Sequence, residues 1–153
     1  MACVVSSRAE APGIGRAERA GIPVIAAADE GETAAFLNGH GVELVVLAGY
    51  MRILTTAFVS RYSGRIMNVH PSLLPSFPGR TPIADALAHG VKVTGVTVHL
   101  IDDDHPRVDS GPIFKQEAVE VPYDGDAVEL ERRIHEVEHR LLPQAVREFG
   151  TAS

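Results

Sequence analysis

The chain has 153 residues, of which 45% are apolar, and its formal net charge is -6. This length and composition suit one compact domain, residues 1–153, with a substantial hydrophobic core. The acidic balance and the scattered basic residues exclude nucleic acid as the expected partner, because binding to a phosphate backbone needs a clustered basic surface. We therefore expect the partner to be a small molecule.

Cys3 is the only cysteine, so the sequence offers no disulfide framework and no cysteine-based zinc site. We expect no metal. The apolar run within the first ten residues, MACVVSSRAE, is too short for a signal peptide or a membrane span. We therefore expect a cytoplasmic protein that does not bind a membrane.

Short apolar runs alternate with helical patterns through the first half of the chain. We expect a strand at residues 2–5, a helix at 14–20, a strand at 23–26, a helix at 33–38, a strand at 43–48, a helix at 53–60 and a strand at 65–69. The continuously apolar centre of residues 43–48 predicts burial on both faces. The alternation predicts a Rossmann-like α/β fold with a mostly parallel sheet flanked by helices.

The second half predicts longer elements. Thr81 and Gly90 delimit an expected helix at residues 82–89. Residues 93–101 and 113–121 carry interleaved polar residues, which predicts a pair of strands around the loop of residues 102–110. A last helix is expected from Asp126, with Glu129 completing a capping box, to about residue 149. Pro143 predicts a kink or break in it.

The segment from Ile66 to Gly79 carries the strongest chemical signal. Asn68 and His70 end an expected strand two residues apart, so their side chains point to one face, and Pro71 begins a proline-stiffened loop. An amide donor beside an imidazole suits an acyl-type transfer, in which one stabilises an oxyanion and the other moves a proton. The alternative is that both residues only satisfy backbone groups of the loop.

Asp109 precedes a Gly-Pro turn, a setting in which aspartate commonly forms an Asx turn. A carboxylate that reached His70 would instead fix the tautomer of the ring and stabilise its imidazolium form. Both interpretations stay open for Asp109.

Glu138 falls within the apolar stripe of the last helix, where a carboxylate needs a partner. It could pair with Arg140 or Arg133, or it could border the site and bind a ligand hydroxyl or amine. Residues 49–54 follow a strand; they could simply start a helix, or their backbone could hydrogen-bond a flat heterocycle.

Four segments together resemble the folate-dependent formyltransferases, most closely their purine-biosynthesis branch. They are Ala48-Gly49-Tyr50-Met51-Arg52-Ile53-Leu54, Met67-Asn68-Val69-His70-Pro71-Ser72-Leu73-Leu74-Pro75-Ser76-Phe77-Pro78-Gly79, Thr94-Gly95-Val96-Thr97-Val98-His99, and Val108-Asp109-Ser110-Gly111-Pro112-Ile113 with Gln116. The resemblance implies the formyltransferase fold and formyl transfer from 10-formyltetrahydrofolate to the amine of glycinamide ribonucleotide, without a metal.

The resemblance also implies roles for individual residues. Asn68 would hydrogen-bond the formyl oxygen, His70 would be the general acid, and Asp109 would orient His70 and assist the proton transfer. Glu138 would meet the ribonucleotide. The folate would contact Asn68 and Asp109 again, together with Met51, Arg52, Ile53, Leu54 and Asp102.

The chain departs from the family pattern in three places. The family normally opens with another strand and a Ser-Gly-x-Gly-Ser-Asn loop that holds the substrate phosphate, so we expect an N-terminally truncated fold. Residues 26–43 form a shorter segment than usual and lack an arginine often found there. The loop of residues 102–107 is longer than the usual spacing between His99 and Asp109.

Three alternatives to the transferase remain. A formyltetrahydrofolate hydrolase shares the Asn-x-His and Asp-x-Gly-Pro elements. A methionyl-tRNA formyltransferase fits less well, because the chain is acidic and has no room for an RNA-binding barrel. A non-catalytic remnant that binds folate would expose strand edges. We expect a monomer or a homodimer.

Overall fold

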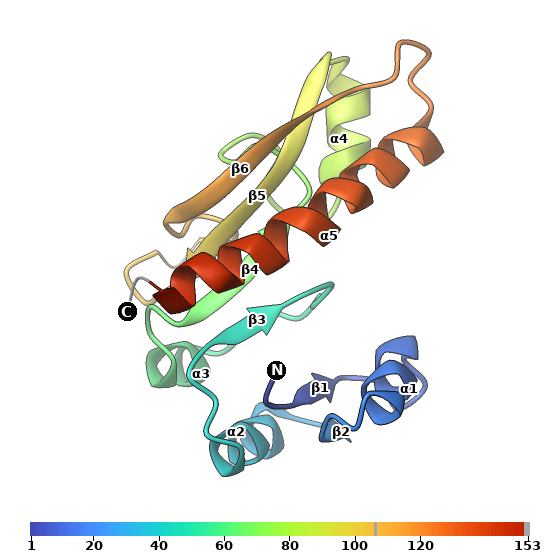
Figure 1. Ribbon diagram of the computed structural model, residues 1–153. Helices are drawn as coiled ribbons and strands as arrows, with labels where there is room; N and C mark the ends of the chain where they lie inside the picture. The colour runs from blue at the N-terminus through green and yellow to red at the C-terminus, as the bar shows by residue number, and fades with distance from the viewer. Residues whose placement is uncertain (106, 152–153) are drawn as a thin grey trace.

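The computed structural model describes residues 1–105 and 107–151. The elements follow in this order: β1 (Val4–Ser6), α1 (Pro12–Arg19), β2 (Val24–Ala26), α2 (Glu30–Gly39), β3 (Val45–Leu47), α3 (Thr56–Arg61), β4 (Ile66–His70), α4 (Pro82–His89), β5 (Val93–Ile101), β6 (Ile113–Glu120) and α5 (Ala127–Thr151) (Figure 1). This confirms the predicted α/β order, and the bounds of α4 and β5 are those expected.

The strands form two sheets. The first pairs β1 with β2 in parallel, and the second has the order β3-β4-β5-β6. Within the second sheet β3 and β4 are parallel, whereas β4, β5 and β6 are antiparallel neighbours. A Rossmann-like α/β class with parallel pairs and flanking helices is thus confirmed, and β5 and β6 pair as predicted.

The expectation that the strand at residues 43–48 is buried on both faces is wrong. Among the described residues β3 pairs with β4 alone, and β1 pairs with β2 alone, so each of β1 and β3 leaves one edge unpaired. In Figure 1 the β1–β2 pair lies beyond β3, on the side away from β4. Val46, at the centre of β3, is 38% exposed rather than buried on both faces.

Two helices begin at other residues than predicted: α2 begins at Glu30 instead of residue 33, and α3 at Thr56 instead of residue 53. A side-chain cap precedes each of these starts. At α2, Oδ1 of Asp29 accepts from the Glu32 N–H at 2.8 Å, and the Glu32 carboxylate accepts from the Ala28 N–H at 2.8 Å. At α3, Thr55 caps the first turn through the Phe58 N–H. The reciprocal pair at α2 and the single bond at α3 satisfy backbone donors that a helix terminus otherwise leaves free.

The long helix α5 begins as predicted and runs on past Pro143 without the expected break. Oδ1 of Asp126 accepts from the N–H groups of Val128 and Glu129, but the Glu129 side chain pairs with arginines instead of completing a capping box. Within residues 1–105 and 107–151, no helix combines the length and apolar character that crossing a bilayer requires.

Two apolar clusters cover opposite faces of β4, because neighbouring strand residues point to opposite sides. Met67 packs with α5 and the inner residues of β5, whereas Ile66 packs with α2 and α3. Figure 1 shows α5 laid along the four-stranded sheet. β4 is therefore held from both sides, which fixes the strand that carries Asn68 and His70.

Gly95 allows β5 to approach both β6 and the loop after β4. A Cβ atom at this position would lie 2.3 Å from the Glu117 carbonyl oxygen and 2.6 Å from a Leu73 methyl carbon. We expect Gly95→Ala to lower the free energy of unfolding by about 1–3 kcal/mol, the usual cost of overpacking. Urea denaturation measures this loss.

Gly13→Ala in α1 is the matched control, because an added Cβ there meets nothing within 4 Å. A helical alanine in place of glycine should leave stability unchanged or raise it by about 0.5–1 kcal/mol. Equal stability of Gly95→Ala and the wild-type chain would show that the contact between β5 and the loop is not tight.

Candidate active site

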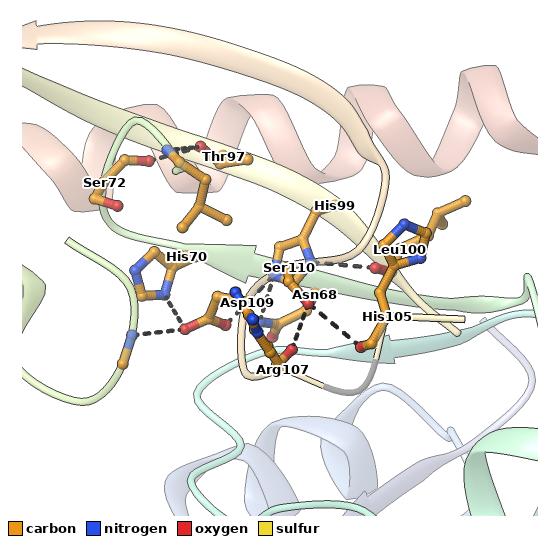
Figure 2. A network of polar contacts seen from close by, with 12 residues as sticks. Asn68, His70, Ser72, Thr97, His99, Leu100, His105, Arg107, Asp109 and Ser110 are labelled. Atoms are coloured by element: carbon orange, nitrogen blue, oxygen red, sulfur yellow. Dashed lines mark hydrogen bonds and ion pairs between the residues drawn. The ribbon is translucent and has the colours of Figure 1, made fainter. Parts of the chain in front are cut away.

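Asn68 and His70 lie on one face of β4, at its carboxyl end, beside a loop that folds back over them (Figure 2). The neighbouring strand β5 sets His99 opposite Asn68 and Thr97 opposite His70. His70 is only 4% exposed. A small polar group of residues is thus gathered at the strand end.

The two ring nitrogens of His70 both face acceptors. Nε2 lies 2.9 Å from the carbonyl oxygen of Phe77, and Nδ1 lies 3.5 Å from Oδ2 of Asp109. A carbonyl and a carboxylate can only accept, so a ring with a proton on each nitrogen satisfies both neighbours. This geometry suits a group that holds and releases a proton.

Asp109 lies between His70 and His99 in Figure 2. Its Oδ2 accepts a hydrogen bond from the Gly79 N–H at 2.8 Å, and its Oδ1 lies 3.6 Å from Nε2 of His99. Burial alone would raise the pKa of the Asp109 carboxyl, but the His99 ring, the Gly79 N–H and the His70 ring outweigh burial and lower it. Asp109 is therefore held ionised beside two histidines.

A tight closure after the long loop fixes Asp109. The Leu100 N–H donates to the Pro112 carbonyl at 2.9 Å, and a Cβ on Gly111 would lie 1.9 Å from the Leu100 oxygen. The chain is therefore back against the end of β5 at Gly111 and Pro112, two and three residues after Asp109. The loop of residues 102–107 therefore does not displace Asp109 from His70.

Thr97 on β5 forms hydrogen bonds with the loop that follows β4. Its Oγ1 donates to the Ser72 carbonyl at 2.7 Å and accepts from the Leu74 N–H at 3.0 Å. Gln116 on β6 donates to the same hydroxyl at 3.0 Å and to the Leu74 carbonyl at 2.8 Å. These hydrogen bonds fix the backbone of the loop at residues 72 and 74 beside the site.

Sequence reasoning assigned no role to His99, which is 1% exposed. Its Nε2 lies 3.2 Å from Nδ2 of Asn68. The signal that could have found it is alternation along β5, which puts it on the same face as Thr97. The antiparallel register that sets it opposite Asn68 is a tertiary property.

The residues predicted to bind a folate follow β3 and β5. Leu47 pairs with Asn68, so the segment after β3 leaves the sheet beside the site. Met51 and Ile53 are 64% and 82% exposed, whereas Leu54 packs on the α2–α3 cluster. The Arg52 guanidinium lies 3.4 Å from the Ala28 oxygen.

Asp102, the remaining residue expected at the folate, follows directly on β5. Its Oδ1 accepts from Nδ1 of His105 at 2.6 Å and from the His105 backbone N–H at 3.1 Å. The structure therefore ties Asp102 into its own loop and does not bring it into the group formed by Asn68, His70 and Asp109.

Glu138 lies on α5 with 18% of its side chain exposed and one oxygen 3.9 Å from Nε2 of His135. The arginine partners considered from the sequence are engaged elsewhere: Arg140 pairs with Glu117, and Arg133 with Glu129. Burial raises the pKa of Glu138, although His135 and His139 oppose the shift. The predicted pairing of Glu138 with Arg140 or Arg133 is thus wrong, and its ion-pair contact among the described residues is the one with His135.

The prediction of no metal overlooked a His-Glu-x-x-His spacing, which residues 135–139 contain. In the structure the rings of His135 and His139 stack with centroids 6.3 Å apart. Among the described residues, no group of three or more histidine, cysteine or acidic side chains is placed to hold a metal ion.

Comparison with known proteins agrees with this geometry. A family model described as "Formyl transferase" matches residues 1–146. The chain belongs to the formyl transferase family. It is 39% identical to the phosphoribosylglycinamide formyltransferase of Bacillus subtilis over 157 residues, covering 97% of the chain and 79% of the relative. It is 46% identical to the "Trifunctional purine biosynthetic protein adenosine-3" of Gallus gallus, covering 94% of the chain but 15% of that protein.

Solved structures of the family have the same fold. The phosphoribosylglycinamide formyltransferase of Anaplasma phagocytophilum superposes with a TM-score of 0.89 at 40% identity, covering 95% of this chain and 72% of that one. A formyltetrahydrofolate deformylase from Pseudomonas syringae superposes with a TM-score of 0.86 at 30% identity, covering 96% and 50%. One protein named as a transferase and one named as a deformylase thus share this fold with the chain.

The raised pKa of Glu138 predicts a small stability gain on neutralisation. Its ionised form is disfavoured in the folded state, so the penalty is present at neutral pH and disappears as the pH falls through the raised pKa. We expect Glu138→Gln to raise the melting temperature by about 1–2 °C at pH 7 and to lose this advantage near pH 4.

Glu136→Gln is the control, because this side chain on the same helix is 64% exposed and pairs with Arg132. It should bring no gain at either pH. Destabilisation by Glu138→Gln at pH 7 would show that the carboxylate has a favourable partner in the free protein.

Proposed function

We propose that residues 1–153 form one catalytic domain that transfers the formyl group of 10-formyltetrahydrofolate to the amine of glycinamide ribonucleotide. The observation that carries the proposal is the convergence of Asn68, His70 and Asp109 at the end of β4. The family membership supports the formyl chemistry. The name of the relative in Bacillus subtilis supports the choice of acceptor.

The proposed reaction needs one oxyanion donor and one proton path. The amine nitrogen attacks the formyl carbon, and the carbonyl electron pair moves onto oxygen, where an N–H of Asn68 stabilises it. The attacking nitrogen loses one proton, and N10 of the folate gains one as the carbon–N10 bond breaks. His70 is the general acid for N10, and Asp109, 3.5 Å from its Nδ1, orients the ring and assists the transfer.

The binding residues belong to the proposal as well. Met51 and Ile53, in the segment after β3, have exposed apolar side chains that would cover the flat pteridine ring. Glu138, a partly buried carboxylate without an arginine partner, would accept hydrogen bonds from ribose hydroxyls of the ribonucleotide. The cytoplasmic location and the monomeric or homodimeric state stay predictions.

A formyltetrahydrofolate hydrolase is the second candidate. The structural similarity to the deformylase of Pseudomonas syringae favours it, because the same Asn, His and Asp constellation can serve water as the attacking group. The products separate the two activities: a transferase gives formylated ribonucleotide, whereas a hydrolase gives formate without an acceptor.

Removal of either catalytic group tests the proposal. We expect His70→Ala and Asn68→Ala to lower kcat for formyl transfer by roughly 10²–10³-fold, the usual loss for a general acid or an oxyanion donor. KM for the folate should change little. The measurement is the initial rate of tetrahydrofolate release with both substrates.

His40→Ala is the control, because its ring packs against the Phe36 ring of α2 and its Nδ1 lies 2.8 Å from the Phe36 carbonyl oxygen, so its contacts are with α2 and not with the site. It should keep the wild-type rate. Formate release that does not require the ribonucleotide would favour the hydrolase. Folate binding without turnover of either kind would favour the non-catalytic remnant.

A further inference from the structure

The segment between β3 and α3, residues 48–55, carries much of the proposed folate surface. The structure describes all of these residues, and none of them belongs to a helix or a strand. Met51 and Ile53 in this segment have largely exposed apolar side chains. At one end the segment continues β3, and at the other end Thr55 caps α3. Contacts from outside the segment therefore decide where these two side chains lie.

The carboxylate of Glu30 ties the end of this segment to α2. Its Oε1 accepts a hydrogen bond from the Thr55 backbone N–H at 2.9 Å, and its Oε2 accepts one from the Thr55 hydroxyl. The same hydroxyl accepts from the Phe58 N–H, which leaves its own hydrogen for Glu30. Because a carboxylate has two acceptor oxygens, Glu30 meets both donors of Thr55 at once.

Two further interactions join α2 and the residues before it to the segment. The Arg52 guanidinium lies 3.4 Å from the carbonyl oxygen of Ala28. Burial, and after it the Glu30 carboxylate, raise the pKa of the Tyr50 phenol, while the Arg52 guanidinium opposes this shift. Glu30 therefore interacts with both ends of the stretch of residues 50–55.

A role within α2 is the simpler explanation for an acidic residue at this place, since acidic side chains in a first turn complement the helix dipole. Glu32, in the same turn, does act within its own helix, because its carboxylate accepts from the Ala28 N–H. Glu30 instead binds a residue 25 positions further along the chain. The contact with Thr55 is thus a tertiary contact, which the start of α2 does not require.

We propose that Glu30 is a positioning residue for the folate, which holds residues 50–55 so that Met51 and Ile53 together cover one face of the pteridine ring. The inference rests on the proposed function for the identity of that ligand. Glu30 acts through Thr55 and not on the folate itself. A segment that is already held does not lose its conformational freedom when the ligand binds, so the contact strengthens binding and leaves the chemical step unchanged.

Two substitutions of Glu30 test this role. We expect Glu30→Ala to raise the dissociation constant of tetrahydrofolate by roughly 3–10-fold, because two solvent-accessible hydrogen bonds to a carboxylate are lost. KM for the formyl donor should rise with it, whereas kcat should stay within about 2-fold. Glu30→Gln should restore most of the affinity, since its amide oxygen accepts from the Thr55 N–H and its NH₂ donates to the Thr55 hydroxyl. Titration calorimetry measures the dissociation constants.

Glu32→Ala is the matched control, because it removes the same charge from the same turn of α2 together with a contact inside that helix. It should keep the wild-type affinity for tetrahydrofolate. Equal affinity of Glu30→Ala and the wild-type chain would overturn the inference. An equal weakening by Glu32→Ala would overturn it as well, because the effect would then come from α2 as a whole.

Amide hydrogen exchange of the free chain tests the contact without folate and without activity. We expect the Thr55 N–H to exchange faster in Glu30→Ala than in the wild-type chain, and to keep its wild-type rate in Glu32→Ala. Unchanged exchange at Thr55 in Glu30→Ala would overturn the inference even if the affinity for folate fell. Absence of tetrahydrofolate binding by the wild-type chain would instead overturn the proposed function.

Discussion

The register of β4 against β5 is the constraint on which the site depends. Five residue pairs align these strands, from Ile66 opposite Ile101 to His70 opposite Thr97. Because strand side chains alternate, a slip of one residue would turn Asn68 and His70 into the apolar cluster beneath them. The two clusters that cover opposite faces of β4 make such a slip costly, so core packing and site geometry are set by the same contacts.

The loop after β4 owes its rigidity to a second group of contacts. Prolines restrict its backbone, but Thr97 and Gln116 fix where it lies through three hydrogen bonds to residues 72 and 74, and a fourth hydrogen bond joins Gln116 to Thr97. Its Phe77 carbonyl faces His70, and its Gly79 N–H binds Asp109. This loop and its supporting hydrogen bonds therefore orient His70 and Asp109, the two groups to which the proposed reaction assigns the proton transfer.

Much of the architecture follows from the sequence, because apolar periodicity and turn residues are local signals. Alternation alone places Asn68 and His70 on one face. The pairing of His99 with Asn68 is not local, since it depends on an antiparallel register between segments 31 residues apart. The position of Asp109 beside His70 is set with the close approach of Gly111 and Pro112 to Leu100, which is a contact between distant segments and not a local signal. The exposure of Val46 is not local either, because it depends on which strands pair with β3.

Asp109 also has a backbone φ of 55°, in the left-handed region that asparagine, aspartate and glycine adopt most readily. Position 109 thus requires a residue that tolerates a left-handed backbone and that also carries a carboxylate for Gly79, His70 and His99. Aspartate meets both requirements. Asparagine would meet the first and fail the second, so a family member with asparagine at this position would keep the contour of the site without its charge. Position 109 is therefore constrained twice, by the conformation of its backbone and by the contacts of its carboxylate with Gly79, His70 and His99.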